Sequence, residues 1–428
     1  MAGLNKYQAY PEYRDSGVEW LGEIPRTWQA YTGKRLFSSV RTPALSNDEQ
    51  LAASQKYGVI PQTLMMQLND SKVMLALKGT DSFRHVEKNN FVISLRCFEG
   101  GIEHSNYQGC VSPAYTVLKS VNDISFSFYR YLLKSEPYIS ALQASTDSLR
   151  DGKSINYEQF GAITLPSPSL PEQSIIAHFL DHETAKIDNL IEKQQQLIEL
   201  LKEKRQAVIS HAVTKGLNPD VPMKDSGVEW LDEIPEHWRI CKLKNLAKIC
   251  NGQDYKLVQA ETGYPVIGSG GQFAWANTFL YDKPSVLLGR KGTIDKPLYI
   301  DKAFWTVDTM YYTEVFDCII EKYLYYLALT IQFNRYATNT ALPSMTQEHL
   351  GNYSFSLSFN LSEQKLIINS IEKSLIKIDA LTEKQLKQIE LLKERRTALI
   401  SAAVTGKIDL RNWTAPIAKT EAPTEASA

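Results

Sequence analysis

The sequence predicts an α+β protein with a pseudo-two-fold internal repeat, in which two globular domains are separated by a pair of long antiparallel coiled-coil helices. Two observations carry this prediction. The segment DSGVEWLGEIPRTW at 15–28 recurs as DSGVEWLDEIPEHW at 225–238 and is identical at eleven of fourteen positions. A longer segment, 186–214, recurs without a gap at 377–405 and is identical at 20 of 29 positions. Internal repeats of this length indicate a duplicated architecture.

Length and composition set the number and class of domains. A chain of 428 residues is too long for one hydrophobic core, and 43% hydrophobic with 22% charged residues is ordinary for a globular protein. The net charge of −1 indicates no particular partner. Five cysteines without a Cys-x-x-Cys pair fit a reducing cytosol and do not support disulfides. Without an apolar leader or a run of eighteen apolar residues, the chain is expected in the cytoplasm and not in a membrane.

The longer repeat predicts two helices. Glu, Lys and Gln, which favour helices, surround apolar residues that keep the three-and-four spacing of one helix face. In the first copy these apolar residues are Ile187, Leu190, Ile191, Leu197, Ile198, Leu201 and Val208. LPEQ and LSEQ precede the copies, and Gly216 and Gly406 follow them as expected C-caps. A helix of about 60 Å with a narrow apolar stripe needs a partner, so a coiled coil is favoured over isolated surface helices.

The order of the repeats predicts the domains and the direction of the helices. We expect a first globular domain at 1–170, a first helix at 171–216, a second domain at 217–360, a second helix at 361–407 and a disordered tail at 408–428. The second short repeat follows the first helix by about ten residues, so it lies at the far end of that helix. Symmetry then requires antiparallel helices. We call 15–28 and 225–238 the first and second joint boxes, and we expect their tryptophans to fill the joints: Trp20, Trp28, Trp230 and Trp238.

Two landmarks relate the otherwise different globular segments. KVMLALKGT at 72–80 corresponds to SVLLGRKGT at 285–293, which predicts a strand that ends in Lys-Gly-Thr. SINYEQFGAITL at 154–165 corresponds to SMTQEHLGNYSF at 344–355, with Ser, Glu and Gly in equal places. We therefore expect two related α+β domains with mixed strands and glycine-rich turns.

No segment predicts an active site. SPAY at 112–115 differs by one residue from the S-P-P-Y type of motif with which amino-methyltransferases hold a flipped base, and we interpret it as a buried strand edge. The seven histidines show no metal-ligand spacing. A self-contained DNA methyltransferase with a degenerate motif remains the alternative, and a coiled-coil scaffold for other proteins is a third hypothesis.

Two different domains on a rigid spacer predict recognition of two features at a fixed separation. Duplex DNA suits such a ruler because half-sites repeat about every 34 Å. Residues 1–165 hold 17 basic and 16 acidic side chains, and residues 217–360 hold 13 and 16, so binding would depend on local clusters in strand-end loops. Arg and Lys there can donate to guanine O6 and N7, although a solvated hairpin tip is the plainer interpretation. The candidate DNA-binding residues are Lys78, Thr80, Arg84, Lys88, Arg96, Arg290, Lys291, Thr293 and Lys296.

The order of joint box, variable domain and repeated helix resembles the specificity subunit of bacterial type I restriction–modification enzymes. The two joint boxes and the two helical repeats with their LPEQ and LSEQ openings carry the resemblance. GRKGT at 289–293 and FEGGIEHSNYQGCVSPAYTVL at 98–118 are similar to segments of that family's target-recognition domains.

This resemblance implies partners that composition does not reveal. It implies two target-recognition domains, each reading one half of a bipartite, asymmetric site in double-stranded DNA. It implies that the helices dock two modification subunits, which bind S-adenosylmethionine and methylate adenine. Restriction or translocase subunits that use ATP and magnesium would join them. This chain would then carry no catalysis and bind no cofactor or metal itself.

Overall fold

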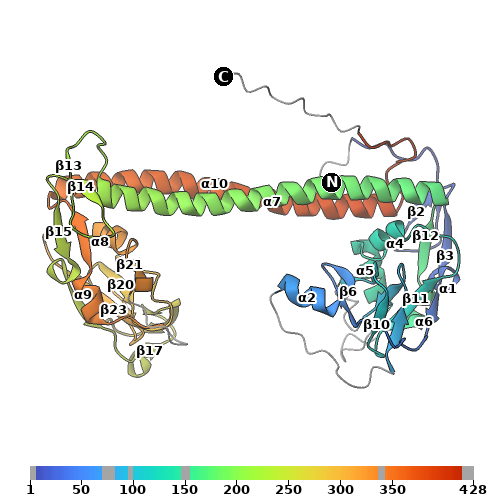
Figure 1. The fold of residues 1–428 in the computed structure, drawn as a ribbon, viewed down its shortest axis with the longest axis horizontal. Helices are drawn as coiled ribbons and strands as arrows, with labels where there is room; N and C mark the ends of the chain where they lie inside the picture. The colour runs from blue at the N-terminus through green and yellow to red at the C-terminus, as the bar shows by residue number, and fades with distance from the viewer. Residues whose placement is uncertain (1–5, 70–81, 95–99, 146–154, 336–342, 417–428) are drawn as a thin grey trace. The chain divides into compact units, whose positions relative to one another are not determined.

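The computed structural model describes residues 6–69, 82–94, 100–145, 155–335 and 343–416, and it divides into two compact units. Unit 1 contains residues 1–194 and 387–428, and unit 2 contains residues 195–386. Each unit therefore combines one globular domain with part of each long helix. Both units mix helices and strands, which confirms the predicted α+β class (Figure 1). Among the helices of the described residues, none combines the length and the hydrophobicity that a membrane span requires.

Unit 1 contains twelve short strands and five short helices in its described residues. The strands are β1 (Tyr13–Asp15), β2 (Glu23–Pro25), β3 (Gln29–Thr32), β4 (Phe37–Val40), β5 (Leu51–Ser54), β6 (Gly58–Pro61), β7 (Arg84–Val86), β8 (Phe91–Ile93), β9 (Glu103–His104), β10 (Gly109–Val111), β11 (Thr116–Ser120) and β12 (Thr164–Ser167). The helices are α1 (Gly33–Leu36), α2 (Gln62–Asn69), α4 (Phe126–Leu132), α5 (Glu136–Ala144) and α6 (Tyr157–Ala162).

Unit 2 contains twelve strands and five short helices, three of them 3₁₀ helices, in its described residues. The strands are β13 (Met223–Asp225), β14 (Glu233–Pro235), β15 (Arg239–Lys242), β16 (Ala247–Asn251), β17 (Gln259–Ala260), β18 (Tyr264–Gly268), β19 (Gly271–Ala276), β20 (Ser285–Gly289), β21 (Leu298–Ile300), β22 (Trp305–Thr306), β23 (Met310–Val315) and β24 (Ser354–Leu357). The helices are η2 (Leu243–Asn245), η3 (Lys256–Val258), α8 (Glu321–Ala328), η4 (Phe333–Arg335) and α9 (Gln347–Asn352).

The central sheet has the same topology in both units. Its strand order is β4-β11-β8-β9 in unit 1 and β16-β23-β20-β21 in unit 2. Every neighbouring pair is antiparallel in both sheets. The globular segments differ widely in sequence, so the shared topology reflects a duplicated domain fold. This finding confirms the predicted internal repeat.

The sheet topology corrects one predicted correspondence. The sequence pairs 72–80 with β20, but the strand of unit 1 that occupies the place of β20 is β8. Ile93 of β8 lies opposite Thr116 of β11, just as Leu288 of β20 lies opposite Tyr311 of β23. Short apolar strands resemble one another by composition, so the similarity at Lys-Gly-Thr was misleading. The whole of 72–80 lies outside the described residues.

The second predicted landmark is confirmed. Asn156 and Thr346 cap α6 and α9 by accepting a hydrogen bond from the amide three residues later, at 2.9 and 3.1 Å. Each helix leads into a strand, β12 or β24, which pairs with the strand that follows a joint box, β3 or β15. The matching segments therefore close the two globular domains in the same way.

Two long helices, α7 (Leu170–Lys215) and α10 (Leu361–Val404), run antiparallel to each other within each unit (Figure 1). In unit 1, Arg396 of α10 donates to both carboxylate oxygens of Asp188 of α7, at 2.9 and 3.2 Å. In unit 2, Arg205 of α7 donates to Asp379 of α10. The two aspartates hold the same position in the helical repeat, and so do the two arginines. The same ion pair therefore forms twice with the helices exchanged.

Glycines end both long helices, as the sequence predicts. Gly216 and Gly406 have φ angles of +78° and +73°, the left-handed region in which a glycine is favoured. Helix α10 ends at Val404 rather than at 407, because the left-handed residue Gly406 ends the helical hydrogen bonding two residues after Val404.

The seam between the long helices is narrower than predicted. Ile187, Ile198 and Leu201 are buried, but Leu190 and Leu197 are 46% and 39% exposed. The last two each precede a seam residue by one position, which turns them about 100° around the helix and out of the contact. Several leucines thus remain exposed on the outside of both helices, among them Leu190, Leu197 and Leu200 on α7, and Leu381, Leu386 and Leu391 on α10.

Each joint box packs against the start of a long helix. Trp28 and Trp238 are fully buried, and their Nε1 atoms donate to Glu172 and Glu363 at 2.9 and 3.1 Å. These glutamates belong to LPEQ and LSEQ. Each joint box therefore contacts the LPEQ or LSEQ segment that opens a long helix.

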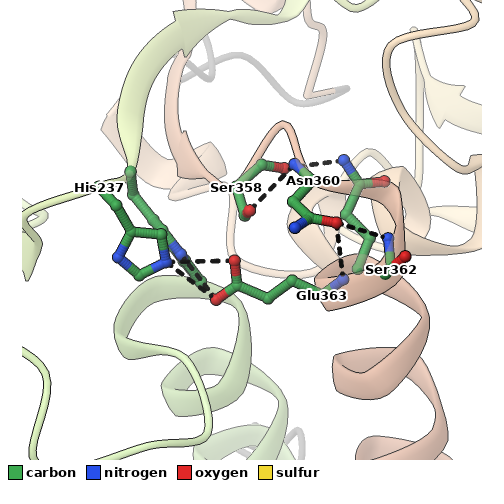
Figure 2. A network of polar contacts seen from close by, with 7 residues as sticks. His237, Ser358, Asn360, Ser362 and Glu363 are labelled. Atoms are coloured by element: carbon green, nitrogen blue, oxygen red, sulfur yellow. Dashed lines mark hydrogen bonds and ion pairs between the residues drawn. The ribbon is translucent and has the colours of Figure 1, made fainter.

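The two joints differ in the other groups that bind the carboxylate. Glu172 is buried and also accepts a hydrogen bond from the hydroxyl of Tyr10 at 2.6 Å. Glu363 is partly exposed, and both of its oxygens lie 3.2 Å from Nε2 of His237 (Figure 2). Asn360 caps α10 beside this network, because its Oδ1 accepts hydrogen bonds from the amides of Ser362 and Glu363 at 2.9 and 3.4 Å (Figure 2).

The glutamines of LPEQ and LSEQ tie each long helix to its own domain. Oε1 of Gln173 accepts a hydrogen bond from the amide of Ser125, and Oε1 of Gln364 accepts one from the amide of Ile320, both at 2.9 Å. Ser125 and Ile320 are the N-caps of α4 and α8. Glutamate and glutamine together therefore fix the joint box and a short helix onto the start of each long helix.

Candidate nucleic-acid interface

In unit 2, the candidate DNA-binding residues lie in the loop that follows β20. The amides of Arg290 and Lys291 donate to the carbonyl of Thr309 at 2.9 and 3.2 Å. The amide of Gly292 donates to the carbonyl of Pro343 at 3.0 Å, and its φ of +83° would strain any residue with a side chain. The loop is therefore held in a defined conformation by two other segments of the same domain.

This loop carries three cationic side chains, Arg290, Lys291 and Lys296, and one carboxylate, Asp295. Arg290 is half-buried, with its guanidinium carbon 5.7 Å from the centroid of the Tyr311 ring. Lys291 and Lys296 are exposed, and neither makes a hydrogen bond or ion pair through its side chain with another described residue. Thr293 is half-buried between them. Lys291 and Lys296 form no ion pair with a carboxylate of the described residues, so both could bind phosphates.

In unit 1, the described candidate residues differ in whether their side chains are hydrogen-bonded within the domain. Arg84 opens β7, and its Nη1 donates to the carbonyl of Tyr115 at 2.6 Å, so this side chain is held by its own domain. Burial, followed by the positive charge of Arg41, lowers the pKa of Arg84. Lys88 is exposed in the turn between β7 and β8. The other three predicted residues, Lys78, Thr80 and Arg96, lie outside the described residues.

The structure adds Arg41, which the sequence analysis missed. Arg41 directly follows β4, is exposed, and lies near enough to Arg84 to lower its pKa. No carboxylate in the described ranges forms an ion pair with it. Two neighbouring guanidinium groups without a carboxylate favour an anion such as phosphate. The sequence could have indicated Arg41 only as a basic residue that directly follows the first strand of the central sheet.

The segment SPAY forms an exposed turn and not the buried strand edge that was predicted. The amide of Tyr115 donates to the carbonyl of Ser112 at 3.0 Å, and Pro113 and Ala114 are exposed. The Tyr115 side chain packs against the small cluster that contains Val117. This packing does not favour the alternative in which SPAY holds a flipped base. In the described residues, no group of His, Cys, Asp and Glu is arranged to hold a metal ion.

The sequence matches a known family model and is similar to characterised proteins. Residues 25–200 and 235–391 match the family model described as Type I restriction modification DNA specificity domain. The chain is similar to the type I restriction enzyme MjaVIII specificity subunit of Methanocaldococcus jannaschii, with 24% identity over 424 residues, 91% of this chain and 95% of that protein. It is also similar to the EcoKI specificity subunit of Escherichia coli, with 30% identity over 157 residues, 35% of this chain and 31% of that protein.

Solved structures share the fold. The HsdS subunit from Thermoanaerobacter tengcongensis superposes with a TM-score of 0.53 at 14% identity, over 90% of this chain and 98% of that chain. A chain from a study of complex assembly and conformational transition of the type I R-M system gives 0.69 at 13% identity, over 90% and 99%. Because the family model matches most of the sequence in two copies, the chain belongs to the type I restriction–modification DNA specificity subunits, which recognise DNA and are not themselves enzymes.

Proposed function

We propose that this chain selects the DNA site of a cytoplasmic type I restriction–modification complex, with each globular domain reading one half of a bipartite site in double-stranded DNA. The observation that carries the proposal is the shared central sheet with different loops. Unit 2 presents Arg290, Lys291 and Lys296 after β20, whereas unit 1 presents Arg41 and Lys88 near the equivalent sheet. A common scaffold with different loops is what two readers of different sequences require.

The exposed leucines of the long helices support docking of two modification subunits. Leu190 and Leu381 hold the same position in the helical repeat, and so do Leu200 and Leu391. Unit 1 contains Leu190 and Leu391, and unit 2 contains the other two. Exposed apolar side chains can mark protein contacts, and an equivalent pair of leucines in each unit fits two copies of one partner. S-adenosylmethionine, ATP and magnesium would be bound by modification and restriction subunits in the complex.

A charge in one leucine patch should release one partner copy. In Leu190→Glu/Leu391→Glu, a carboxylate would have to be buried in the apolar contact of unit 1, which is strongly unfavourable. Native mass spectrometry should then find one modification subunit per chain in place of two. The matched variant Leu200→Glu/Leu381→Glu should lose the other copy, and the four substitutions together should lose both. Full occupancy of the fourfold variant would contradict docking on these helices.

Exchange of one domain tests the two-reader proposal itself. Replacement of residues 30–160 by the equivalent segment of a relative should change one half of the methylated motif and leave the other half intact, because the second domain is untouched. The measurement is single-molecule sequencing of methylated adenines in cells that contain the assembled complex. A change in both halves would refute the division of labour, and a wild-type complex without a bipartite motif would refute the proposed function.

A further inference from the structure

Strand β19 has an irregularity at Phe273. In its antiparallel pairing with β18, Ala274 lies opposite Val266 and Gln272 lies opposite Ile267. Phe273 therefore has no partner residue and is the extra residue of a β-bulge. Bulges bend a strand and redirect a side chain, and they are frequent beside functional sites.

The Phe273 ring lies beside the candidate loop that follows β20. A Cβ at Gly268 would be 3.2 Å from this ring and 3.5 Å from Oγ1 of Thr309, so the ring and this hydroxyl flank the same glycine. The same Oγ1 accepts a hydrogen bond from the amide of Ser269 at 3.3 Å. The carbonyl of Thr309 holds the loop after β20, and a Cβ at Gly292 of that loop would be 3.1 Å from Oγ of Ser269. The aromatic ring and the basic loop therefore both adjoin the segment of Gly268 and Ser269.

The ring is held in place but is not covered. Phe273 is 54% exposed, although its edge-to-face contact with Tyr255, with centroids 5.2 Å apart, restricts its orientation. An oriented, uncovered phenyl group can bury apolar surface on binding at little cost in conformational entropy. Lys291, exposed and unpaired among the described residues, would draw a polyanion onto this same surface.

We infer that Phe273 contacts the 5-methyl group of a thymine beside the bases or phosphates bound by the loop after β20. The inference rests on the proposed function and deepens it by naming the base that this side chain selects. Thymine methyl is the apolar group that base edges present in the major groove, so an aromatic ring beside Arg and Lys reads thymine there. Stacking of the ring between bases would first require unstacking of the duplex, which is costly.

The test uses the complete chain assembled with its modification subunits and a mapped target site. Each thymine of the half-site read by unit 2 is replaced in turn by deoxyuridine, which lacks only the methyl group. One replacement should weaken binding by the wild-type complex about fourfold, the effect of losing one buried methyl-sized group. Phe273→Ala should bind the thymine and deoxyuridine duplexes equally at that position.

Two control variants separate this contact from general damage. Phe279→Ala removes a comparably exposed phenyl group, which packs on Tyr264. Tyr264 begins β18 and lies about 13 Å along the strand from Gly268, where β18 ends. This variant should retain the fourfold discrimination. Arg290→Ala should weaken binding of both duplexes by the same factor and leave their ratio unchanged. Phe273→Leu keeps an apolar side chain and should retain part of the discrimination if the alanine variant folds poorly.

The outcomes distinguish failure of the inference from failure of the proposed function. Undiminished discrimination by a folded Phe273→Ala variant overturns the inference, as does a wild-type complex that binds its site but is insensitive to every deoxyuridine. Phe273→Ala could instead weaken binding of all duplexes equally, while 2-aminopurine fluorescence reveals unstacked bases in the wild-type complex. That result would also overturn the inference, because the ring would then stack between bases and not contact a methyl group. A wild-type complex that binds no specific duplex would instead refute the proposed function.

Discussion

Four residues inserted after Gln194 in α7, and four after its repeat equivalent Gln385 in α10, should widen the gap between the two recognised half-sites by one or two base pairs. Four residues add about 6 Å and a little more than one helical turn, so the seam is nearly preserved. DNA rises about 3.4 Å per base pair. Both half-sites should stay the same because neither reading domain is altered. Methylated-adenine mapping measures the gap and the half-sites together.

Two-residue insertions at the same places are the matched control. They rotate the apolar stripe by about 200°, which turns the buried seam residues away from the partner helix. We therefore expect impaired assembly in place of a shifted gap. A four-residue variant that changed the half-site bases, or kept the original gap, would show that the long helices do not act as the ruler.

Glu172→Ala should destabilise unit 1 by about 2–4 kcal/mol. Trp28 and Tyr10 both donate to this carboxylate and are almost completely buried, so the substitution leaves two donors without an acceptor. Each such donor costs about 1–3 kcal/mol. Burial, followed by the hydrogen bond to Glu172, raises the pKa of Tyr10, which keeps the phenol protonated as a donor. Native-state hydrogen exchange in the core of each unit measures the effect locally, since a chain of two units is not expected to unfold in one step.

Glu363→Ala is the control that the repeat itself provides. This carboxylate is partly exposed, and only one of its two donors there, Trp238, is buried, whereas His237 is half in water. We therefore expect a smaller loss of about 1 kcal/mol in unit 2. Equal losses in the two units would contradict the role given to burial. Glu172→Gln keeps an acceptor for Trp28 and should be less harmful than Glu172→Ala.

Glu363 also makes the stability of unit 2 depend on pH. Burial tends to raise its pKa, but hydrogen bonds from Ser358, Trp238 and His237 outweigh that effect and lower the pKa of the carboxyl. A lowered folded pKa means that the ionised group stabilises the fold above its ordinary pKa of 4.5 and that this contribution disappears as the pH falls through the lowered value. The difference in stability between wild type and Glu363→Gln should therefore shrink below about pH 4.5.

The repeated parts of the fold were predictable because the spacing of apolar residues in the sequence matches the turn of the helix. The long helices and their glycine caps follow from apolar spacing and from residues with one conformational use, Gly216 and Gly406. The width of the seam was not predictable from that spacing. Leu190 and Ile191 both satisfy a three-and-four pattern, and only the crossing of two helices decides which of them is covered.

The candidate interface was only partly predictable because its residues come from loops distant in sequence. Arg290 and Lys291 were found because they follow an apolar strand directly. Nothing in the local sequence indicates that Thr309 holds their loop, because a backbone carbonyl leaves no mark on residue type. The bulge at Phe273 likewise arises from pairing between strands, so the alternation of residues along one strand does not predict it.

The pair of ion pairs between α7 and α10 has a consequence for how such a chain can change. Asp188 binds Arg396, and Asp379 binds Arg205, so each helix supplies both an acid and a base at equivalent sites. That is the self-complementary pattern of a two-fold homodimer, here with both copies joined in one chain. A half from another protein with aspartate and arginine at the same positions should therefore keep both ion pairs. If each domain reads one half-site, as proposed, exchange of halves would combine two readers without a change in the helix contact.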